Sequence, residues 1–247
     1  MSSVLLSVET ATPGGSLAIS SGSGILASSL GNSQLSHSNT VLRDIDRLLS
    51  MANLRINDVG LFAVTIGPGS FTGLRIGIAT VKGLAATLNR RCIGIPTLHA
   101  IAHAAGPSSA TLALLPAGRG EVFAQLLEVS ENEVIIELDS AAHIPPRSLF
   151  DRYGSIENLC CAGPGAHAHC ETLRELAKQR GTEIVDSNRK VKGWRLAPVT
   201  PNLAIHVAAL AWVEAERADE QTANALTALY VRPSDAEINL RYSRDRK

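Results

Sequence analysis

The chain has 247 residues, of which 45% are hydrophobic and 4% aromatic, and its 23 Lys and Arg residues balance its 23 Asp and Glu residues. This length allows one or two domains, and the composition is typical of an α/β protein with an aliphatic core. The balanced charge excludes a strongly basic or strongly acidic protein. The charge is unevenly distributed, however, because no acidic residue occurs between Asp58 and Glu121. The surface built from this part of the chain therefore favours an anionic ligand or partner.

The sequence predicts neither a secretory leader nor a membrane span. The N-terminus lacks the basic start of a signal peptide and reaches Glu9 too early. The long uncharged stretch 92–118 is broken by Pro96, Pro107 and several polar residues. The four cysteines include no CxxC pair, so we expect reduced, buried thiols. We therefore expect a cytoplasmic protein with no membrane partner.

The first half begins with a buried strand, Ser3–Ala11, and two further strands that follow glycine-rich turns, which predicts a three-stranded meander. From Ser38 to Ala52 the apolar residues recur with a helical period. The continuous apolar run Leu61–Gly67 is typical of a parallel strand that is covered on both faces. A helix from Ser70 to Leu88 and a short strand at 92–96 complete this half.

The second half repeats the same order of elements. Its expected elements are strands at 110–116, 121–130 and 133–140, a short helix at 148–154, a strand at 159–163, a helix at 166–180, a strand at 182–186 and a helix at 201–219. Three meandering strands followed by helix, strand, helix and strand, twice in one chain, predict an α/β protein of two related subdomains. We place the subdomains at 1–105 and 106–235, with a flexible basic tail at 236–247.

The stretch GPGSFTGLRIGIATVKGLA, Gly67 to Ala85, looks like a phosphate-binding loop that leads into a helix. It matches none of the familiar motifs. A Walker A loop and a dinucleotide fingerprint would both need a glycine where Thr72 stands, and the fingerprint also needs an acid about 20 residues later. A nucleophile elbow centred on Ser70 would need glycines where Pro68 and Thr72 stand. Ser70 is instead predicted to cap the helix.

Glycines inside this helix reduce its stability, by up to about 1 kcal/mol each relative to alanine, so other contacts must offset the loss. Gly73 and Gly77 are four residues apart and share one face, which permits another backbone to approach closely. That face meets either a second helix, within the chain or on a partner, or the sheet beneath in ordinary internal packing. The spacing alone does not separate these interpretations.

Six segments, in order along the chain, resemble the bacterial TsaB (YeaZ) family. They are VETATPGGSLAI at 8–19, SHSNTVLRDIDRLL at 36–49, GPGSFTGLRIGIATVKGLA at 67–85, GIPTL at 94–98, RGEVFAQLLEV at 119–129 and LYVRP at 229–233. The resemblance implies the actin-like (ASKHA, RNase H-like) duplicated fold, with two α/β subdomains and mixed sheets. It also implies a part in making threonylcarbamoyladenosine at position 37 of tRNAs that read ANN codons. Members of this family are non-catalytic in that pathway and pair with the paralogue TsaD, which performs the transfer.

The resemblance further implies the partners and the docking face. TsaD is the expected heterodimer partner, the ATPase TsaE joins the pair, tRNA is reached through the complex, and a homodimer is expected when TsaD is absent. The helices at 38–52 and 70–88 are expected to form the docking face, and Arg75 is expected to place a cation near the contact with the partner. By helical phase and small-residue spacing, its residues are Leu42, Ile45, Leu49, Gly73, Arg75, Ile76, Gly77 and Thr80. No intrinsic cofactor is expected, and ATP or ADP would act at the level of the complex.

The residues expected at a nucleotide site argue against catalysis by this chain alone. The resemblance maps the first phosphate loop onto Glu9, Thr10 and Thr12, with Glu where Asp is usual. It maps the second onto Pro116-Ala117-Gly118, where most relatives have Asp-Ala-Arg. One extra methylene displaces the carboxylate enough to disturb an octahedral metal shell. We therefore assign no catalytic and no metal-binding residue, and we expect the first loop, Gly163 and Gly165 near any bound nucleotide.

Two other classes of function stay open. An enzyme, either an autonomous actin-like ATPase or a glycoprotease-type metallopeptidase, would need Glu9 to bind metal and His99 and His103 to hold a second site. The two histidines are four residues apart, but Ala100 stands where a zinc peptidase has its general base. A nucleotide-binding sensor would use the Gly163-Pro164-Gly165 turn to hold an adenosine.

One further segment has a composition seen in RNA-binding proteins. It contains Arg189, Lys190, Lys192 and Arg195, with Trp194 among them. Such a segment either contacts RNA phosphates and offers an aromatic platform for a base, or is an ordinary solvated loop.

Overall fold

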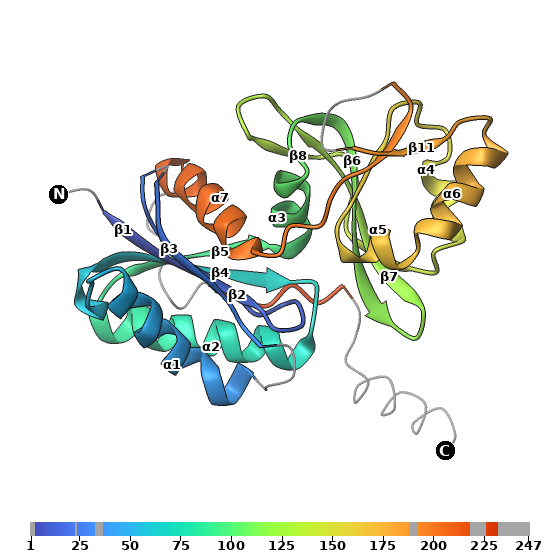
Figure 1. The fold of residues 1–247 in the computed structure, drawn as a ribbon. Coiled ribbons are helices and arrows are strands. Elements are labelled where there is room, and N and C mark those ends of the chain that lie inside the picture. The colour runs from blue at the N-terminus through green and yellow to red at the C-terminus, as the bar shows by residue number, and fades with distance from the viewer. Residues whose placement is uncertain (1–2, 23, 33–36, 188–191, 218–225, 232–247) are drawn as a thin grey trace, which may run out of the picture.

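The chain folds into two α/β halves, each built on one β-sheet (Figure 1). The computed structural model describes residues 3–22, 24–32, 37–187, 192–217 and 226–231. The expected tail at 236–247 lies outside the described residues. Among the helices in these ranges, none combines the length and the apolar character that crossing a bilayer requires.

The first sheet has five strands in the order β3-β2-β1-β4-β5. Its strands are β1 (Val4–Glu9), β2 (Ser16–Ser21), β3 (Gly24–Leu30), β4 (Val59–Gly67) and β5 (Arg91–Pro96). Strands β1, β4 and β5 are parallel, whereas β2 and β3 complete an antiparallel meander with β1. Because β4 lies between β1 and β5 and is covered on both faces, seven of its nine residues are buried, as its continuous apolar run predicts.

Helices cover both faces of this sheet. α1 (His37–Met51) and α2 (Phe71–Leu88) lie on one face, and α7 (Leu203–Arg217) lies on the other (Figure 1). Alternate residues of β1 separate the two layers, since Leu6 packs in the cluster with α1 and α2, and Leu5 packs in the cluster with α7. A short 3-10 helix, η1 (Ile56–Asp58), leads into β4.

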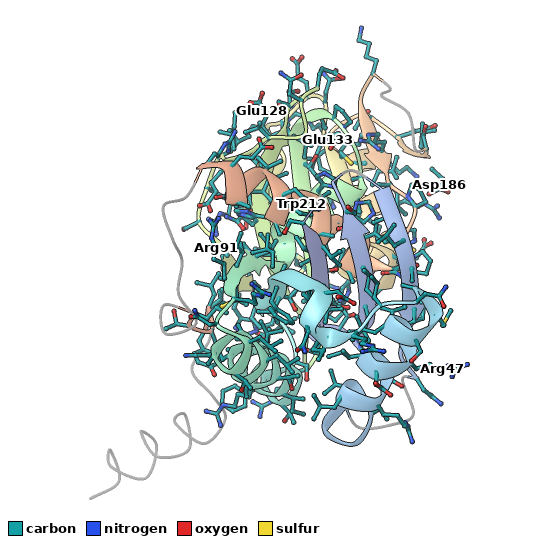
Figure 2. All side chains as sticks on the ribbon, turned by 90° about the vertical axis from the view of Figure 1, so that its left-hand side faces the viewer. Arg47, Arg91, Glu128, Glu133, Asp186 and Trp212 are labelled. Carbon is teal, nitrogen blue, oxygen red and sulfur yellow. The ribbon has the colours of Figure 1, made fainter. Side chains whose placement is uncertain are left out.

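α7 belongs to the first half in space although it follows the second half in sequence. Its Trp212 donates a hydrogen bond from Nε1 to Ser20 Oγ of β2, at 3.0 Å, and lies where α7 meets the strands (Figure 2). The range 106–235 expected for the C-terminal subdomain therefore includes a helix that packs on the N-terminal sheet. The division at residue 105 stays a prediction.

The second sheet repeats the topology of the first. Its strands are β6 (Ser108–Gly118), β7 (Glu121–Val129), β8 (Ile135–Glu137), β9 (Ala142–Ile144), β10 (Cys160–Ala162), β11 (Ile184–Asp186) and β12 (Trp194–Leu196). The order β8-β7-β6-β10-β12 corresponds to β3-β2-β1-β4-β5, with β11 added at the edge and β9 paired with β7. The pairing directions correspond as well. The α/β class and the duplicated, RNase H-like arrangement with mixed sheets are therefore confirmed.

Four helices belong to or adjoin this second half. They are α3 (Thr97–Ala104), α4 (Ser148–Tyr153), α5 (Pro164–Ala168) and α6 (Cys170–Gln179). The single helix expected at 166–180 is interrupted, because His169 has non-helical backbone angles between α5 and α6. The sequence does not predict strands β9 and β12; β12 lies in the basic segment that the sequence predicts to be either an RNA-binding segment or a solvated loop.

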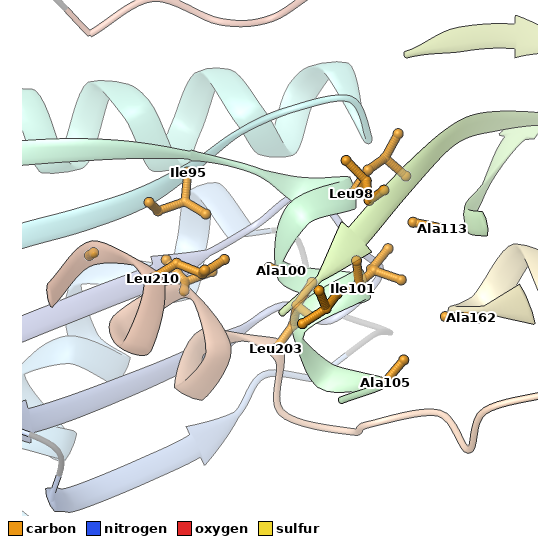
Figure 3. Close-up of a cluster of buried hydrophobic side chains, with 14 of the residues drawn as sticks. Ile95, Leu98, Ala100, Ile101, Ala105, Ala113, Ala162, Leu203 and Leu210 are labelled. Atoms are coloured by element: carbon orange, nitrogen blue, oxygen red, sulfur yellow. The ribbon is translucent and has the colours of Figure 1, made fainter. Parts of the chain in front are cut away.

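One apolar cluster joins the two halves. α3 contributes Leu98 and Ile101, which are 0% and 3% exposed, and α7 contributes Leu203 and Leu210 (Figure 3). The same cluster includes residues of both sheets, such as Ala113 of β6. The two sheets are therefore held through a shared core and not through a surface contact between finished domains.

Replacing Ile101 with alanine should lower the free energy of unfolding by about 2–5 kcal/mol, because it opens a cavity in this shared core. The loss should affect both halves in one cooperative transition, so urea unfolding followed by fluorescence and by circular dichroism should give coincident curves. Val199→Ala, at a 45% exposed position, should change the stability by no more than about 0.5 kcal/mol. Two separate transitions in wild type would contradict a shared core.

Candidate functional site

A cleft of about 660 Å³ opens between the two halves. One wall consists of the loops that follow β1 and β4 with the start of α2, and the other consists of the β6–β7 hairpin and the start of α5; residues 229–231 also line the cleft. Such crevices at the carboxyl ends of parallel strands are the usual ligand sites of α/β folds. The lining residues are Ala11, Pro13, Pro68, Gly69, Ser70, Phe71, Leu74, Leu115, Pro116, Ala117, Gly118, Phe123, Pro164, Leu229, Tyr230 and Val231.

The lining of this cleft is almost entirely apolar. Within the described ranges it includes no Asp, Glu, Lys, Arg or His, and its only side-chain hydroxyls belong to Ser70 and Tyr230. Ser70 is already engaged, because its Oγ accepts a hydrogen bond from Gly73 N at 3.2 Å and caps α2 as predicted. Pro116, Ala117 and Gly118, the last residues of β6 before the turn into β7, line the cleft and are neither acidic nor basic. The lining residues themselves therefore offer no side chain of opposite charge to phosphates or to a divalent ion. The cation Arg75 lies beside this lining, against Phe71 and Tyr230.

Glu9 is buried at the end of β1, and its carboxylate is satisfied within its own turn. It accepts hydrogen bonds from Thr12 N and Thr12 Oγ1, both at 2.8 Å, and from Ser16 Oγ at 3.3 Å. Burial raises the pKa of this carboxyl, and these hydrogen bonds oppose the rise. Neither Glu9 nor Thr10 lines the cleft. The carboxylate closes the turn between β1 and β2, which accounts for its position without a bound metal.

Of the other residues expected near a nucleotide, Thr12 and Gly163 line a smaller pocket of about 240 Å³, whereas Gly165 does not line it. The two glycines also have a packing role. A Cβ on Gly163 would lie 2.6 Å from Leu114 O, and one on Gly165 would lie 2.7 Å from Leu114 C. Only glycine permits this approach of α5 to β6. Their proximity to a nucleotide stays a prediction.

The glycines singled out in α2 face inward, which corrects their assignment to a partner interface. A Cβ on Gly73 would lie 1.9 Å from Thr10 O, and one on Gly77 would lie 2.2 Å from Thr10 Oγ1. Both glycines therefore admit the β1 loop beneath the helix. Gly83 is the outward-facing glycine of α2, because it is exposed and a Cβ there would meet nothing within 4 Å.

Two of the α1 residues assigned to the docking face also belong to the core. Ile45 and Leu49 are 3% and 4% exposed and pack against the first sheet, whereas Leu42 is 61% exposed. The sequence correctly predicts that these residues share one apolar face of α1. That face covers the first sheet and is therefore not available to a partner. On α2, Arg75 is exposed and Ile76 and Thr80 are half-buried, so these residues and Leu42 stay predicted interface residues.

Comparisons with known proteins identify the family to which this chain belongs. Residues 31–239 match the model of the family TsaD: tRNA N6-adenosine threonylcarbamoyltransferase. The chain belongs to this family, within its TsaB/YeaZ group. It is 30% identical to the tRNA threonylcarbamoyladenosine biosynthesis protein TsaB of Escherichia coli over 119 residues, 47% of this chain and 52% of that protein. It is 40% identical to the Haemophilus influenzae TsaB protein over 72 residues, 29% of this chain and 30% of that protein.

Solved structures of the TsaB/YeaZ group have the same fold. A protein with similarity to peptidase YeaZ from Pseudomonas aeruginosa superposes with a TM-score of 0.74 at 25% identity, over 93% of this chain and 100% of that one. YeaZ from Pseudomonas aeruginosa superposes with a TM-score of 0.72 at 24% identity, over 92% and 99%. The sequence matches to the TsaB proteins are shorter than these superpositions. The chain spans about half the length of the Escherichia coli protein and 30% of the length of the Haemophilus influenzae protein.

The two histidines proposed as a metal pair bind different carboxylates. His99 Nε2 lies 3.1 Å from Glu137 Oε1, and His103 Nε2 lies 3.5 Å from Glu133 Oε2. Across the described part of the chain, no three His, Cys, Asp or Glu side chains are grouped so that they could hold a metal ion. Burial lowers the pKa of both imidazoles, with their glutamates opposing the shift. The histidines thus link α3 to the β7–β8 hairpin, and the second metal site required by the peptidase alternative does not form in these residues.

Of the two interpretations of the basic segment, the structure excludes the one in which Trp194 is an aromatic platform for RNA. Trp194 is 2% exposed, and its Nε1 donates a hydrogen bond to Ile156 O at 2.9 Å. Arg195 is 4% exposed and donates to Ala105 O at 3.0 Å. Both side chains belong to β12 and pack inside the second half, so neither offers a surface to a base. Arg189 and Lys190 lie outside the described residues and Lys192 is exposed, so contact of this segment with RNA phosphates stays a prediction.

Gly73→Ala and Gly83→Ala should have opposite effects on stability although both change one helix. The Gly73 variant should lose about 2 kcal/mol or more, because the new methyl group would overlap the Thr10 carbonyl. The Gly83 variant should gain up to about 1 kcal/mol from the higher helix propensity of alanine. Urea midpoints at constant pH measure both changes. Equal destabilisation by the two variants would show that Gly83 also has a close neighbour.

The free energy of unfolding should decrease between pH 6.5 and 4, because the half-buried imidazoles of His103 and His206 resist protonation in the folded state. His103 Nδ1 and His206 Nδ1 are 2.9 Å apart, so one ring donates to the other, and burial together with the charge of His103 lowers the pKa of His206 to about 4. Because an unfolded histidine titrates near pH 6.5, the unfolded chain binds more protons between pH 6.5 and 4. His206 alone should then cost at most about 3 kcal/mol of unfolding free energy over this range.

The measurement is the urea midpoint as a function of pH in wild type and in His206→Gln. The variant should remain folded at pH 7 and should show a shallower decline below pH 6.5. An unchanged slope in the variant would mean that other groups cause the acid sensitivity.

Proposed function

We propose that this chain is a non-catalytic scaffold and activator subunit in the synthesis of threonylcarbamoyladenosine at position 37 of tRNAs that read ANN codons. In this role it pairs with TsaD, which performs the transfer, and the ATPase TsaE and tRNA act through the complex. The chain itself holds no cofactor, and any ATP or ADP is bound at the level of the complex. Its similarity to the TsaB proteins of Escherichia coli and Haemophilus influenzae and its match to the TsaD family support the pathway.

The observation that carries the non-catalytic role is the chemistry of the cleft between the halves. In this fold a nucleotide hydrolase needs carboxylates and cations at the loops that meet there. In this chain the described lining has no charged side chain, and the end of β6 that lines the cleft reads Pro116-Ala117-Gly118. The nearby Glu9 carboxylate already accepts hydrogen bonds from Thr12 N and Thr12 Oγ1 of its own turn. A folded cleft without charged groups suits a subunit that retains the shape of an enzyme without its chemistry.

The size of the exposed side chains on the outer face of α1 and α2 favours docking through these two helices. The exposed residues of α2 are small along most of its length, including Ala79, Gly83 and Ala86, while α1 exposes Leu42 and Met51. Small residues let a second helix approach closely, and the exposed apolar side chains of α1 supply area to bury. A TsaD helix pair would cover this face, and a second copy of this chain would cover it when TsaD is absent.

The decisive experiment is size-exclusion chromatography with light scattering on this protein, alone and mixed with TsaD from the same cell. Threonylcarbamoyl transfer to tRNA is then assayed with and without TsaE. We expect a stable heterodimer and transfer only in the mixture. Turnover of ATP or of tRNA by this chain alone, or the absence of any association, would overturn the proposal.

Gly83→Leu should abolish pairing with TsaD while the monomer stays folded. The added side chain has open space within the chain, so its clash falls only on a helix docked from outside. Glu175→Leu on α6 is the matched control, since it places leucine at an exposed helical position of the second half. Light scattering should show a monomer for Gly83→Leu and a heterodimer for the control. Heterodimer formation by both variants would place the interface elsewhere.

A further inference from the structure

A short segment from the far end of the chain lies against α2. We name residues 226–231 the C-terminal strap. Leu226 is 5% exposed in the same core cluster as α2, and its carbonyl accepts a hydrogen bond from Lys82 Nζ at 3.1 Å. Leu229 N donates to Ile66 O at the end of β4, at 2.7 Å. The strap is therefore fixed to β4 and to α2 at separate points, and its position on the surface is defined.

The strap places Tyr230 over the first turns of α2, where it contacts Phe71 and Arg75. The Phe71 and Tyr230 rings are 5.3 Å apart, and the Arg75 guanidinium carbon lies 3.8 Å from the centre of the Phe71 ring. Arg75 Nε donates to Tyr230 Oη at 3.4 Å. Stacking on one ring and bonding to the other reduce the conformational freedom of the long side chain.

The terminal nitrogens of Arg75 are left for a ligand. Within the described residues neither of them makes a hydrogen bond or an ion pair. α2 has no acidic residue, and its other cation, Lys82, is engaged by the strap. Arg75 is exposed on the face of α2 that continues through Ala79 and Gly83. Because those two side chains are small, they leave the guanidinium accessible to a docked partner. A guanidinium held in this way offers two parallel N–H donors, the geometry that a carboxylate accepts.

We propose that Arg75 binds a carboxylate side chain of the protein that docks on α2, and that Tyr230 of the strap is the residue that positions it. The inference rests on the proposed docking function. It adds to the docking face the pair Arg75 and Tyr230, which are 155 positions apart in sequence. The strap thereby becomes part of the docking surface. Binding energy at interfaces concentrates on such arginines when aromatic neighbours hold them in place and exclude water.

The test compares the affinities of Arg75 and Tyr230 variants for TsaD by calorimetry at low and at high salt. Arg75→Ala should weaken binding at least about tenfold at low salt and should reduce its salt dependence. Arg75→Lys should recover little, because an ammonium cannot stack or bind bidentately. Tyr230→Ala should weaken binding less than Arg75→Ala, Tyr230→Phe should restore part of that loss, and the Arg75→Ala/Tyr230→Ala double variant should resemble Arg75→Ala.

Two controls separate this inference from the docking function. Arg90→Ala removes an exposed cation just beyond the other end of α2 and should leave the affinity within about twofold. Gly83→Leu tests the docking face itself. If Gly83→Leu abolishes binding but Arg75→Ala does not weaken it, the inference fails and the docking function stands. If wild type does not bind TsaD, the docking function fails first.

The ligand class is tested on the chain without its partner. ATP titrated into wild type and into Arg75→Ala should show no binding that depends on Arg75. Nucleotide binding that is lost in the variant would assign Arg75 to a phosphate and would overturn the carboxylate proposal.

Discussion

Every other feature of this molecule depends on the packing of α3 and α7 between the two sheets. α3 has only eight residues, too few to be stable as a helix by itself, and it exists because Leu98 and Ile101 are buried from all sides. α7 comes last among the described helices yet covers the first sheet. Neither sheet has a complete core without the other half. The cleft is consequently a fixed feature of one packed body.

The cleft loop and the proposed docking helix are parts of one packed unit. Thr10 fits beneath Gly73 and Gly77, Ser70 N donates to Ala11 O at 2.8 Å, and the strap spans from α2 to the end of β4. A protein that lacks charged groups in its cleft can still keep this geometry, since the core and not the cleft stabilises the fold.

Much of the architecture could be predicted from the sequence, because apolar periodicity reports which segments form strands and helices. The meander, the central strand β4, α2 with its Ser70 cap and the repetition of the order all follow from such local patterns. The site was less predictable. Helical phase identifies the apolar stripe of α1 but does not tell whether Ile45 meets a sheet or a partner, and the spacing of Gly73 and Gly77 indicates close approach without naming the neighbour. Trp194 sits in a basic segment, and only its burial shows that it is a core residue.

By itself the sequence determined the α/β class, the doubled element order, the absence of charged residues from the Pro116-Ala117-Gly118 segment and the resemblance to TsaB proteins. These properties are set by neighbours along the chain or by residue identity alone. Only the tertiary structure decided that Gly83 and not Gly73 faces outward, that His99 and His103 bind separate glutamates, and that Tyr230 meets Arg75. Each of these facts depends on which distant segment packs against a given face, and that choice minimises the exposed apolar surface of the whole chain.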